Sequence, residues 1–488
     1  MTMINDIISK KNGAHKEKIL QFGEGNFLRA FSDWMINKSN NDGVYDGSIV
    51  VCQPVKEGLS ELLNAQDCTY TLAMRGIENA SPVEKVETIT SISRCINPYS
   101  DFKAFLDIAK SEDLEVIISN TTEAGISYLA GDSINDAPPT SFPAKVTLFL
   151  YTRYQAFKGA LDKGLLFLPV ELIDNNGDKL KEIVLKYAAE WNLEEAFINW
   201  INEANKFTNT LVDRIVTGYP KSELEYFENK LGYKDNAIVT SELFNLWVIE
   251  GKKEWASIIP IDKTDANVIW TNDVTPYKKR KVRILNGAHT ATVLAAYLSG
   301  HDYVLDFMQD PAFKKYLDEL IFDEIIPTLD LPKSELEEFA HAVSDRFSNP
   351  YIKHSLLDIS LNSCSKFTAR CLPSLLQYKE LKGSIPSHLS FALASFIRFY
   401  KGEFVDETYL GNRRENKYYP IRDSQHVIDF FASSWTQSPE NIVHNTLSNT
   451  SLWEGMDLSK IEGLESAVKA HLDKIMNLEI SEIISNLK

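Results

Sequence analysis

The sequence contains no apolar stretch close to the roughly 20 residues that a membrane-spanning helix requires. Its first 18 residues alternate apolar with polar side chains and never form the apolar core of a signal peptide. We therefore expect a protein that is soluble and stays in the cytoplasm.

Cysteine is scarce as well. The five cysteines are an odd number with no C-x-x-C pair, and a chain of 488 residues is far larger than the domains that disulfides stabilise. Reduced thiols in a cytosol are the simplest interpretation. The metalloprotease pattern H-E-x-x-H and the hydrolase pattern G-x-S-x-G are missing too, and the histidines are scattered. We therefore expect no bound metal.

Basic residues are outnumbered, 51 against 68 acidic residues, which gives a net charge of −17. A surface this negative repels a nucleic-acid backbone, and the densest basic run, residues 278–281, begins an apolar helix. Nucleic acid is therefore not an expected partner. The composition, 44% hydrophobic and 24% charged, is that of an ordinary globular protein, and the length favours two domains.

The first half of the chain alternates short apolar strands with helical segments. Strands are predicted at 18–22, 48–52, 114–119 and 166–171. A helix is predicted from Asn26, as its N-cap, to about Lys38. Continuous β-branched runs such as 48–52 are typical of strands buried on both faces. The alternation predicts an α/β domain with a Rossmann-type, doubly wound parallel sheet.

From about residue 277 the pattern changes to helical periodicity, and convincing strands are scarce. Helices are predicted at 282–298, 313–322, 333–343, 389–400 and 461–477. We therefore predict an α/β domain over residues 1–275 and a mostly α-helical domain over residues 276–488.

A glycine turn separates the first predicted strand from the first predicted helix, in the sequence F-G-E-G-N-F-L-R-A. Glycines at this point let the backbone approach the pyrophosphate of a dinucleotide, and the helix N-terminus supplies free N–H groups. Gly23 and Gly25 are present, but Leu28 replaces the third glycine of G-x-G-x-x-G. The alternative is an ordinary tight turn. Arg29 contacts a phosphate or pins the loop to an acid.

The end of the second strand is where NAD and NADP are distinguished, because an acidic residue there binds the ribose hydroxyls. Here Gln53 is neutral, and Lys56 follows three residues later. Gln53 can bond ribose hydroxyls and Lys56 can attract a 2′-phosphate, so both cofactors remain open. The candidate cofactor-binding residues are Gly23, Gly25, Asn26, Phe27, Arg29, Gln53, Ser119 and Asn120.

A second motif, K-V-R-I-L-N-G-A-H, contains Lys281, Asn286 and His289. On an α-helix, Asn286 lies about 140° and His289 about 80° from Lys281 at roughly 100° per residue, so all three fit one broad cleft. Apolar neighbours there would lower the pKa of the lysine, as a general acid/base near neutral pH requires. The alternative is that none of the three is catalytic. Lys281 would then be a solvent-exposed cation at the helix start, Asn286 a hydrogen-bonded polar group and His289 a histidine of the core.

Together, G-x-G-x-F-x-R-A and K-x-x-x-x-N-x-x-H about 260 residues later resemble the polyol-specific long-chain dehydrogenase/reductase family, that of mannitol dehydrogenase. The likeness covers nearly the whole chain and includes segments 119–125, 171–177 and 209–215. Segments 20–31 and 347–353 are most similar to family members that reduce keto sugar acids.

The resemblance implies a metal-independent enzyme that uses NAD. Lys281 would be the general acid/base, Asn286 would bind the reacting oxygen, and His289 would hold that oxygen or a neighbouring hydroxyl. Family members that act on polyols have Asp-Asn after the strand at 166–171, where this chain has Glu171-Leu172. Leu172 cannot donate a hydrogen bond, so Asn286 is left to carry that role.

The resemblance also assigns Asp213 and Lys366 to the substrate site. A sugar acid needs a local cation for its carboxylate, and Arg346, Lys353, Lys366 and Arg370 lie in one stretch of the helical domain. The alternatives are an ion pair or a helix-start acid for Asp213, beside Arg214, and a surface charge for Lys366.

The sequence therefore predicts an NAD-dependent reductase of a keto sugar acid, with a small molecule as its substrate. A sister enzyme for another sugar acid, a polyol or a sugar phosphate is the first alternative. A non-catalytic nucleotide-binding scaffold is the second. The oligomeric state stays open.

Overall fold

The computed structural model describes residues 2–8, 15–122, 124–413 and 417–487. Residues 1 and 9–14, which belong to the N-terminal segment discussed above, and Glu123 of the segment 119–125 lie outside the described residues. The chain divides into two compact units. The first contains residues 1–76 and 83–274, and the second contains residues 77–82 and 275–488.

A six-stranded sheet forms the centre of the first unit, in the order β5-β2-β1-β6-β7-β8 with parallel pairs. The order reverses at β1, and ligands bind at such a switch point, beyond the carboxyl ends of the strands. The predicted parallel sheet is confirmed. Its strands are β1 (Glu17–Phe22), β2 (Ser48–Cys52), β5 (Ile92–Ile96), β6 (Val116–Ser119), β7 (Leu166–Pro169) and β8 (Lys206–Phe207).

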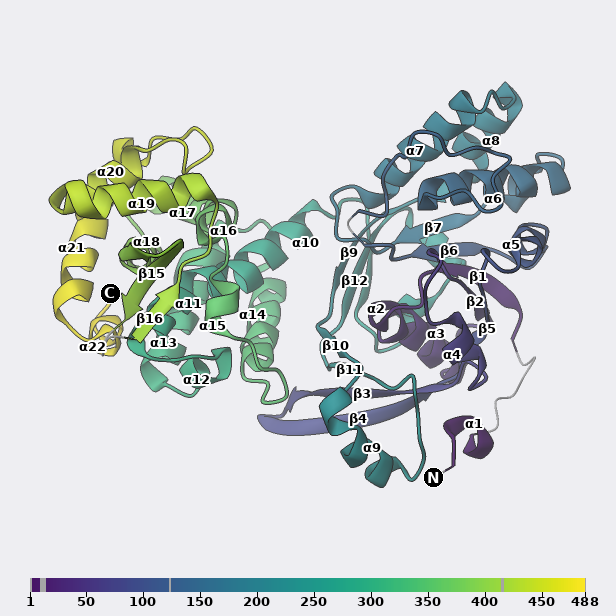
Figure 1. Ribbon diagram of the computed structural model, residues 1–488, viewed down its shortest axis with the longest axis horizontal. Helices are drawn as coiled ribbons and strands as arrows, with labels where there is room; N and C mark the ends of the chain where they lie inside the picture. The colour runs from purple at the N-terminus through teal and green to yellow at the C-terminus, as the bar shows by residue number, and fades with distance from the viewer. Residues whose placement is uncertain (1, 9–14, 123, 414–416, 488) are drawn as a thin grey trace. The chain divides into compact units, whose positions relative to one another are not determined.

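Both faces of this sheet are covered, which is why its strands are continuously apolar. Leu20 and Phe22 pack in a buried cluster with helices of one side, and Ile19 packs in a second cluster on the other side. In Figure 1, α5 to α8 lie on one side of the sheet and α2 to α4 on the other. These helices are α2 (Asn26–Arg29), α3 (Ser32–Asn41), α4 (Ser60–Asn64), α5 (Phe102–Ala109), α6 (Phe142–Ala156), α7 (Asn176–Glu190) and α8 (Glu195–Ala204).

Two smaller sheets of the first unit were not predicted. One has the order β10-β11-β3-β4 and the other β13-β12-β9. β3 and β4 are adjacent strands joined by Asn79 and Ala80, whereas β3 pairs with β11 and β9 pairs with β12 across long stretches of sequence, which no local pattern predicts. The bounds are β3 (Tyr70–Glu78), β4 (Ser81–Ile89), β9 (Asn209–Asp213), β10 (Val216–Gly218), β11 (Val239–Glu242), β12 (Leu246–Glu250) and β13 (Val268–Thr271), with α1 (Ile4–Ile7) and α9 (Leu224–Leu231).

The single helix predicted from Asn26 to about Lys38 is wrong, because two helices, α2 and α3, replace it. Phe31 leaves the helical region, with φ −127° and ψ −89°. Side chains donate hydrogen bonds to carbonyls that backbone amides would bond in a continuous helix. The carbonyl of Arg29 accepts from the Tyr70 hydroxyl (2.7 Å), and the carbonyl of Ala30 accepts from Arg214 Nη1 (2.7 Å). The freed carbonyls are therefore satisfied without a continuous helix.

The second unit is mostly helical, as predicted. Its core contains α11 and α18, which are buried along nearly their whole length, and Figure 1 shows α19, α20 and α21 around α18. The helices are α10 (Thr275–Arg280), the π-helix η5 (Lys281–Gly287), α11 (Ala288–Ser299), α12 (Val304–Met308), α13 (Pro311–Glu319), the π-helix η6 (Leu320–Ile325), α14 (Lys333–Phe347), α15 (Leu356–Ile359), α16 (Ser363–Arg370), α17 (Leu372–Lys382), α18 (Ser387–Phe399), α19 (Gln425–Gln437), α20 (Ile442–Ser448), α21 (Leu464–Asn477) and α22 (Ile480–Ser485).

The second unit also contains an antiparallel sheet that was not predicted, formed by β14 (Gly402–Val405), β15 (Thr408–Arg413) and β16 (Lys417–Pro420). Asp406 and Glu407 connect the first two strands as a two-residue hairpin, and Asp406 has a left-handed φ of +53°. Among the described helices, none has the length and apolar character to cross a membrane.

Candidate active site

The glycine turn joins the end of β1 to α2. Gly23 has a left-handed φ of +121°, and a Cβ added there would lie 3.0 Å from the carbonyl oxygen of Asn120 and 3.0 Å from Leu28 Cδ1. Only glycine therefore lets the turn lie this close to the end of β6. Gly25 is exposed, and a Cβ added there would meet nothing within 4 Å. The turn is thus closed toward the sheet at Gly23 and open at Gly25, which fits a pyrophosphate.

Arg29 supports this turn from within the protein. It is only 2% exposed, and its Nε donates to the carbonyl of Glu24 (3.2 Å). Its Nη2 donates to Asn26 Oδ1 (2.7 Å), and its Nη1 donates to the carbonyl of Ala237. Of the two roles considered for Arg29, the structure shows the one that pins the loop, with carbonyl and amide oxygens in place of an acid.

Gln53 directly follows β2, as expected, but its side chain has a different role from the expected one. The side chain is 2% exposed, and its amide holds the following loop in shape. Its Nε2 donates to the carbonyls of Val55 and Lys56 (2.9 Å each), while its Oε1 accepts from the amide and hydroxyl of Ser60 (3.3 and 2.5 Å). These four bonds use the whole capacity of the amide. In this structure Gln53 offers nothing to a ribose hydroxyl, which corrects the expectation.

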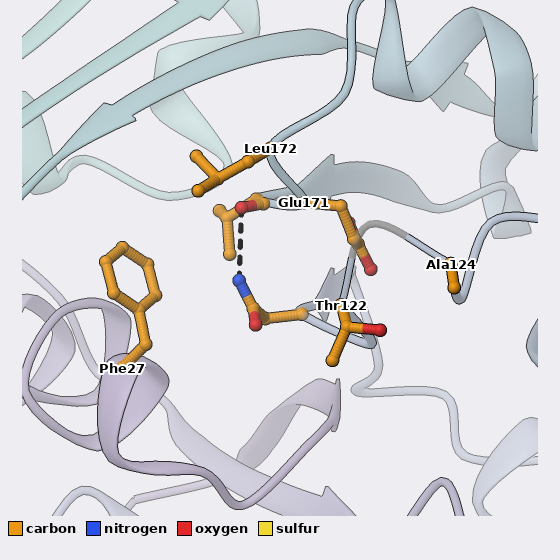
Figure 2. Close-up of a pocket in the computed structure, with 7 residues that line it drawn as sticks. Phe27, Thr122, Ala124, Glu171 and Leu172 are labelled. Atoms are coloured by element: carbon orange, nitrogen blue, oxygen red, sulfur yellow. Dashed lines mark hydrogen bonds between the residues drawn. The ribbon is translucent and has the colours of Figure 1, made fainter. Parts of the chain in front are cut away.

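A cavity of about 500 Å³ lies beyond the carboxyl ends of the central strands. Figure 2 shows Phe27 of α2 and Leu172, just after β7, approaching it from two sides, with the Glu171 carboxylate turned away from Phe27. The dashed line in that view is the bond from Asn120 Nδ2 to the carbonyl of Val170 (3.1 Å). The lining residues are Phe27, Asn120, Thr122, Ala124, Val170, Glu171 and Leu172. An apolar cavity with few polar groups suits a flat heteroaromatic ring.

Glu171 is buried behind this cavity, where it links two strand ends. Its carboxylate accepts from the hydroxyl of Ser119 (3.0 Å) and from the amide and hydroxyl of Thr121 (3.0 Å each). Burial raises the pKa of Glu171, and these hydrogen bonds oppose that rise. The predicted Ser119 therefore contacts Glu171, which lines the cavity, and its role toward a cofactor stays a prediction. Leu172, by contrast, is 63% exposed, so it presents an apolar surface at the cavity.

Asp213 is buried at the end of β9. The neighbouring Arg214 donates from Nη1 to the carbonyl of Ala30 (2.7 Å) and from Nη2 to the carbonyl of Glu242 (3.0 Å). The role of Asp213 toward a substrate stays a prediction.

The lysine motif begins a π-helix, not a regular α-helix. Residues Lys281–Gly287 form η5, and α11 continues from Ala288. A π-helical turn is wider than an α-helical turn and is common at functional sites. The angle between Lys281 and Asn286 is therefore smaller than the roughly 140° calculated for an α-helix. Both side chains are half-buried.

His289 is the centre of a group of cations in the second unit. Its ring stacks on Phe347 at 4.0 Å, and its Nε2 is buried without a hydrogen-bond partner in the described part of the chain. Burial lowers the pKa of His289 well below its usual range, and nearby positive charge lowers it further, from His354, Arg346, Arg370 and Lys366. His289 is therefore neutral near pH 7, and a neutral imidazole can form hydrogen bonds through its ring nitrogens.

Two of these cations lie on α16 and have no acidic partner within ion-pair distance among the described residues. Lys366 Nζ donates to the carbonyl of Ile359 (2.8 Å), and Arg370 Nη1 is 3.5 Å from Thr290 Oγ1. Burial lowers the pKa of Lys366, with a further contribution from Arg370, and burial also lowers the pKa of Arg370. Asp423 is the acidic residue that acts on Lys366 from a distance, by opposing the fall of its pKa. Positive charge gathered on α16, in a chain of net charge −17, fits an anionic ligand.

Several residues of this arrangement were not predicted from the sequence as parts of the site. Arg346 and Arg370 had been considered only as carboxylate partners, Phe347 only as part of the segment 347–353, and His354 was not considered. The signal for them was the density of basic and aromatic residues in 346–370. Nothing in the local pattern marked Glu171 as the acid that joins Ser119 to Thr121.

A parallel sheet with a glycine turn at its switch point, followed by a helical domain with a lysine–asparagine–histidine motif, defines a dehydrogenase with a Rossmann domain. Residues 17–263 match the family model of the mannitol dehydrogenase Rossmann domain, and residues 273–476 match that of the mannitol dehydrogenase C-terminal domain. The chain belongs to the mannitol dehydrogenase family and is an oxidoreductase that acts on CH–OH groups.

Altronate oxidoreductases are among the proteins similar to this chain. Altronate oxidoreductases of Escherichia coli O139:H28 and Shigella flexneri are each 45% identical over 480 residues, which is 97% of this chain and 97% of theirs. Two solved structures share the fold. The mannitol 2-dehydrogenase of Pseudomonas fluorescens, in ternary complex with NAD and D-mannitol, is 22% identical, with a TM-score of 0.64 over 96% of this chain and 94% of its own. A substrate-free D-sorbitol dehydrogenase is 20% identical, with a TM-score of 0.80 over 99% of this chain and 100% of its own.

Proposed function

We propose that this oxidoreductase uses NAD to interconvert tagaturonate and altronate, the reaction of tagaturonate reductase, as a step in hexuronate breakdown. The observation that carries the proposal is the group of cations around His289, since a keto sugar acid differs from a ketose by its carboxylate. The 45% identity to altronate oxidoreductases over almost the whole chain supports it. The five buried free thiols suit the reducing cytoplasm.

The residues of the first unit would hold the cofactor, which supports a dinucleotide-binding domain over residues 1–275. Gly23, Gly25 and Asn26 would meet the pyrophosphate at the open side of the turn. Phe27, Asn120 and Leu172 would surround the nicotinamide in the cavity, with Ser119 and Glu171 fixing its wall. Arg29 and Gln53 would act on the cofactor only by shaping the turn and the loop. NADH, when bound, supplies the hydride that reduces the ketone carbon.

The residues of the second unit would bind the substrate and move the proton, which supports a catalytic domain over residues 276–488. In the reduction direction the Lys281 ammonium gives its proton to the ketone oxygen as negative charge develops there. The Asn286 amide donates to the same oxygen. Neutral His289 offers Nε2, which has no partner among the described residues, to that oxygen or to a neighbouring hydroxyl. Asp213 would accept from a sugar hydroxyl, because it matches a family position at the substrate site.

Lys366 and Arg370 would bind the substrate carboxylate. The Lys366→Met variant should raise the KM for tagaturonate by about tenfold or more while changing kcat little, because a charge-assisted hydrogen bond is lost in both ground and transition states. Its KM for an uncharged ketose should not change. Steady-state kinetics with both substrates measures this selectivity.

Lys353→Met is the matched control, since it removes an exposed lysine of the same stretch. An unchanged KM for tagaturonate in Lys366→Met, with the fold intact, would remove Lys366 from the carboxylate site.

The decisive test of the proposed function is NADH oxidation by the wild-type protein with tagaturonate, fructuronate, fructose and a ketose phosphate. We expect kcat/KM to be highest for tagaturonate. A higher value for any of the other three would assign the protein to a sister activity of the family, and cofactor binding without turnover of any would indicate a scaffold.

A further inference from the structure

Glu24, the residue between the two glycines of the turn, is a buried acid that the proposed mechanism does not use. It is 7% exposed, and its Oε1 accepts from the amide of Leu59 (3.2 Å). Its Oε2 is buried without any hydrogen-bond partner in the described part of the chain. A buried carboxylate oxygen without a donor costs free energy, so its retention calls for a ligand that supplies one.

Glu24 belongs to the turn after β1, but this turn lies beside the carboxyl end of β2. Dinucleotide-binding domains recognise the adenosine ribose at that end. The amide of Gly23 donates to the carbonyl of Cys52, the last residue of β2 (3.1 Å). A Cβ added to Gly58 would lie 2.2 Å from Glu24 Oε1 and 2.4 Å from Gln53 Cδ. The loop after β2 therefore closes directly on the Glu24 carboxylate, and a side chain at residue 58 would require Glu24 and Gln53 to shift.

Gln53 is the other candidate for binding the ribose, but its side-chain amide is already fully hydrogen-bonded. All four hydrogen-bonding positions of the Gln53 amide are taken by its own loop and by Ser60. Arg29 lies close enough to lower the pKa of Glu24, but it donates to the backbone carbonyl of Glu24 and not to the carboxylate. Burial nevertheless raises the pKa of Glu24 overall, as expected of a carboxylate with too few donors.

We propose that Glu24 accepts the hydroxyl hydrogens of the adenosine ribose and excludes the 2′-phosphate of NADP. The inference rests on the proposed use of NAD and identifies the residue that makes this choice. The acid is thus supplied by the glycine turn and not by the end of β2.

Lys56, in the same loop, would favour NADP, because its positive charge attracts a 2′-phosphate. It is exposed, however, so water screens its charge, whereas the Glu24 carboxylate acts from a buried position where charges interact more strongly. The buried acid therefore dominates, and the preference is for NAD.

Binding measurements test this without any turnover. Wild-type protein titrated with NADH and NADPH, followed by intrinsic fluorescence or calorimetry, should bind NADH at least tenfold more tightly. The Glu24→Gln variant should weaken NADH binding about tenfold and reduce the NADPH-to-NADH ratio of Kd values by tenfold or more. Glu57→Gln, which removes an exposed acid of the same loop, should leave the ratio unchanged.

A second measurement uses only the wild-type protein, so it stands even if Glu24→Gln fails to fold. NADH lacking the 2′-hydroxyl of its adenosine ribose should bind about tenfold more weakly than NADH. Equal affinities, or an unchanged ratio of Kd values in folded Glu24→Gln, would overturn the inference while leaving the NAD-dependent function intact. Tighter binding of NADPH by the wild-type protein would overturn the cofactor choice, and binding of neither dinucleotide would overturn both this inference and the proposed function.

Discussion

The Lys281→Ala variant should lose about 10²–10⁴-fold in kcat, because general acid catalysis by a positioned side chain contributes about that factor. The proton needed at the developing alkoxide would then have to come from water. The affinity for NADH should stay within about twofold of the wild-type value, since the candidate cofactor-binding residues all lie before residue 275. Stopped-flow turnover of tagaturonate and a fluorescence titration with NADH measure the two quantities separately.

Lys279→Ala is the matched control for Lys281→Ala. Lys279 is an exposed lysine two residues away that forms an exposed ion pair with Asp330 (3.6 Å), so its loss should leave kcat nearly unchanged. Added primary amines should restore part of the activity of Lys281→Ala. They should not change the activity of Lys279→Ala. Normal kcat in Lys281→Ala would exclude this lysine from the proton transfer.

The Gly25→Val variant should lose at least about 100-fold in NADH affinity, about 3 kcal/mol, and remain folded. Gly25 has φ −67° and ψ 167°, a conformation that any residue adopts, and its Cβ direction is open. The valine side chain therefore strains nothing in the protein and occupies the space that the pyrophosphate needs. Equilibrium titration with NADH, with thermal unfolding as the check on folding, measures the effect.

Gly25→Ala should fall between wild type and Gly25→Val, since the smaller side chain fills less of that space. Gly23→Ala should behave differently: it should lower the melting temperature, because Gly23 has a left-handed φ and its added Cβ meets Asn120 and Leu28. A folded Gly25→Val variant that binds NADH normally would refute the assignment of the pyrophosphate to this turn.

The parallel sheet and the helical second half were predictable because each leaves a local pattern in the sequence. A strand buried on both faces is continuously apolar, as at 48–52, and a helix against a core has a period of 3.6 residues. The break between α2 and α3 was not predictable. It depends on Tyr70 and Arg214, which reach the carbonyls of Arg29 and Ala30 from distant parts of the sequence.

The candidate site likewise contains residues that the sequence predicted and residues that it did not. Gly23, Gly25 and the lysine motif were recognised from spacing, because a close approach of backbone or a set of side chains on one helix is a local property. The roles of Gln53 and Glu24 were not, since the sequence shows which amide or carboxylate is present but not which of its oxygens has a donor. The π-helical turn at 281–287 likewise escaped an argument based on regular α-helices.

The sequence by itself determined the family, the two kinds of domain and the positions of the motifs, because these depend on residue types and on spacing along the chain. The tertiary structure alone decided which cations surround His289, which acid joins Ser119 to Thr121 and which carboxylate oxygen is left without a donor. The physical reason is that hydrogen bonds and charge interactions act over a few ångströms in space, between residues whose distance in sequence carries no information about that proximity.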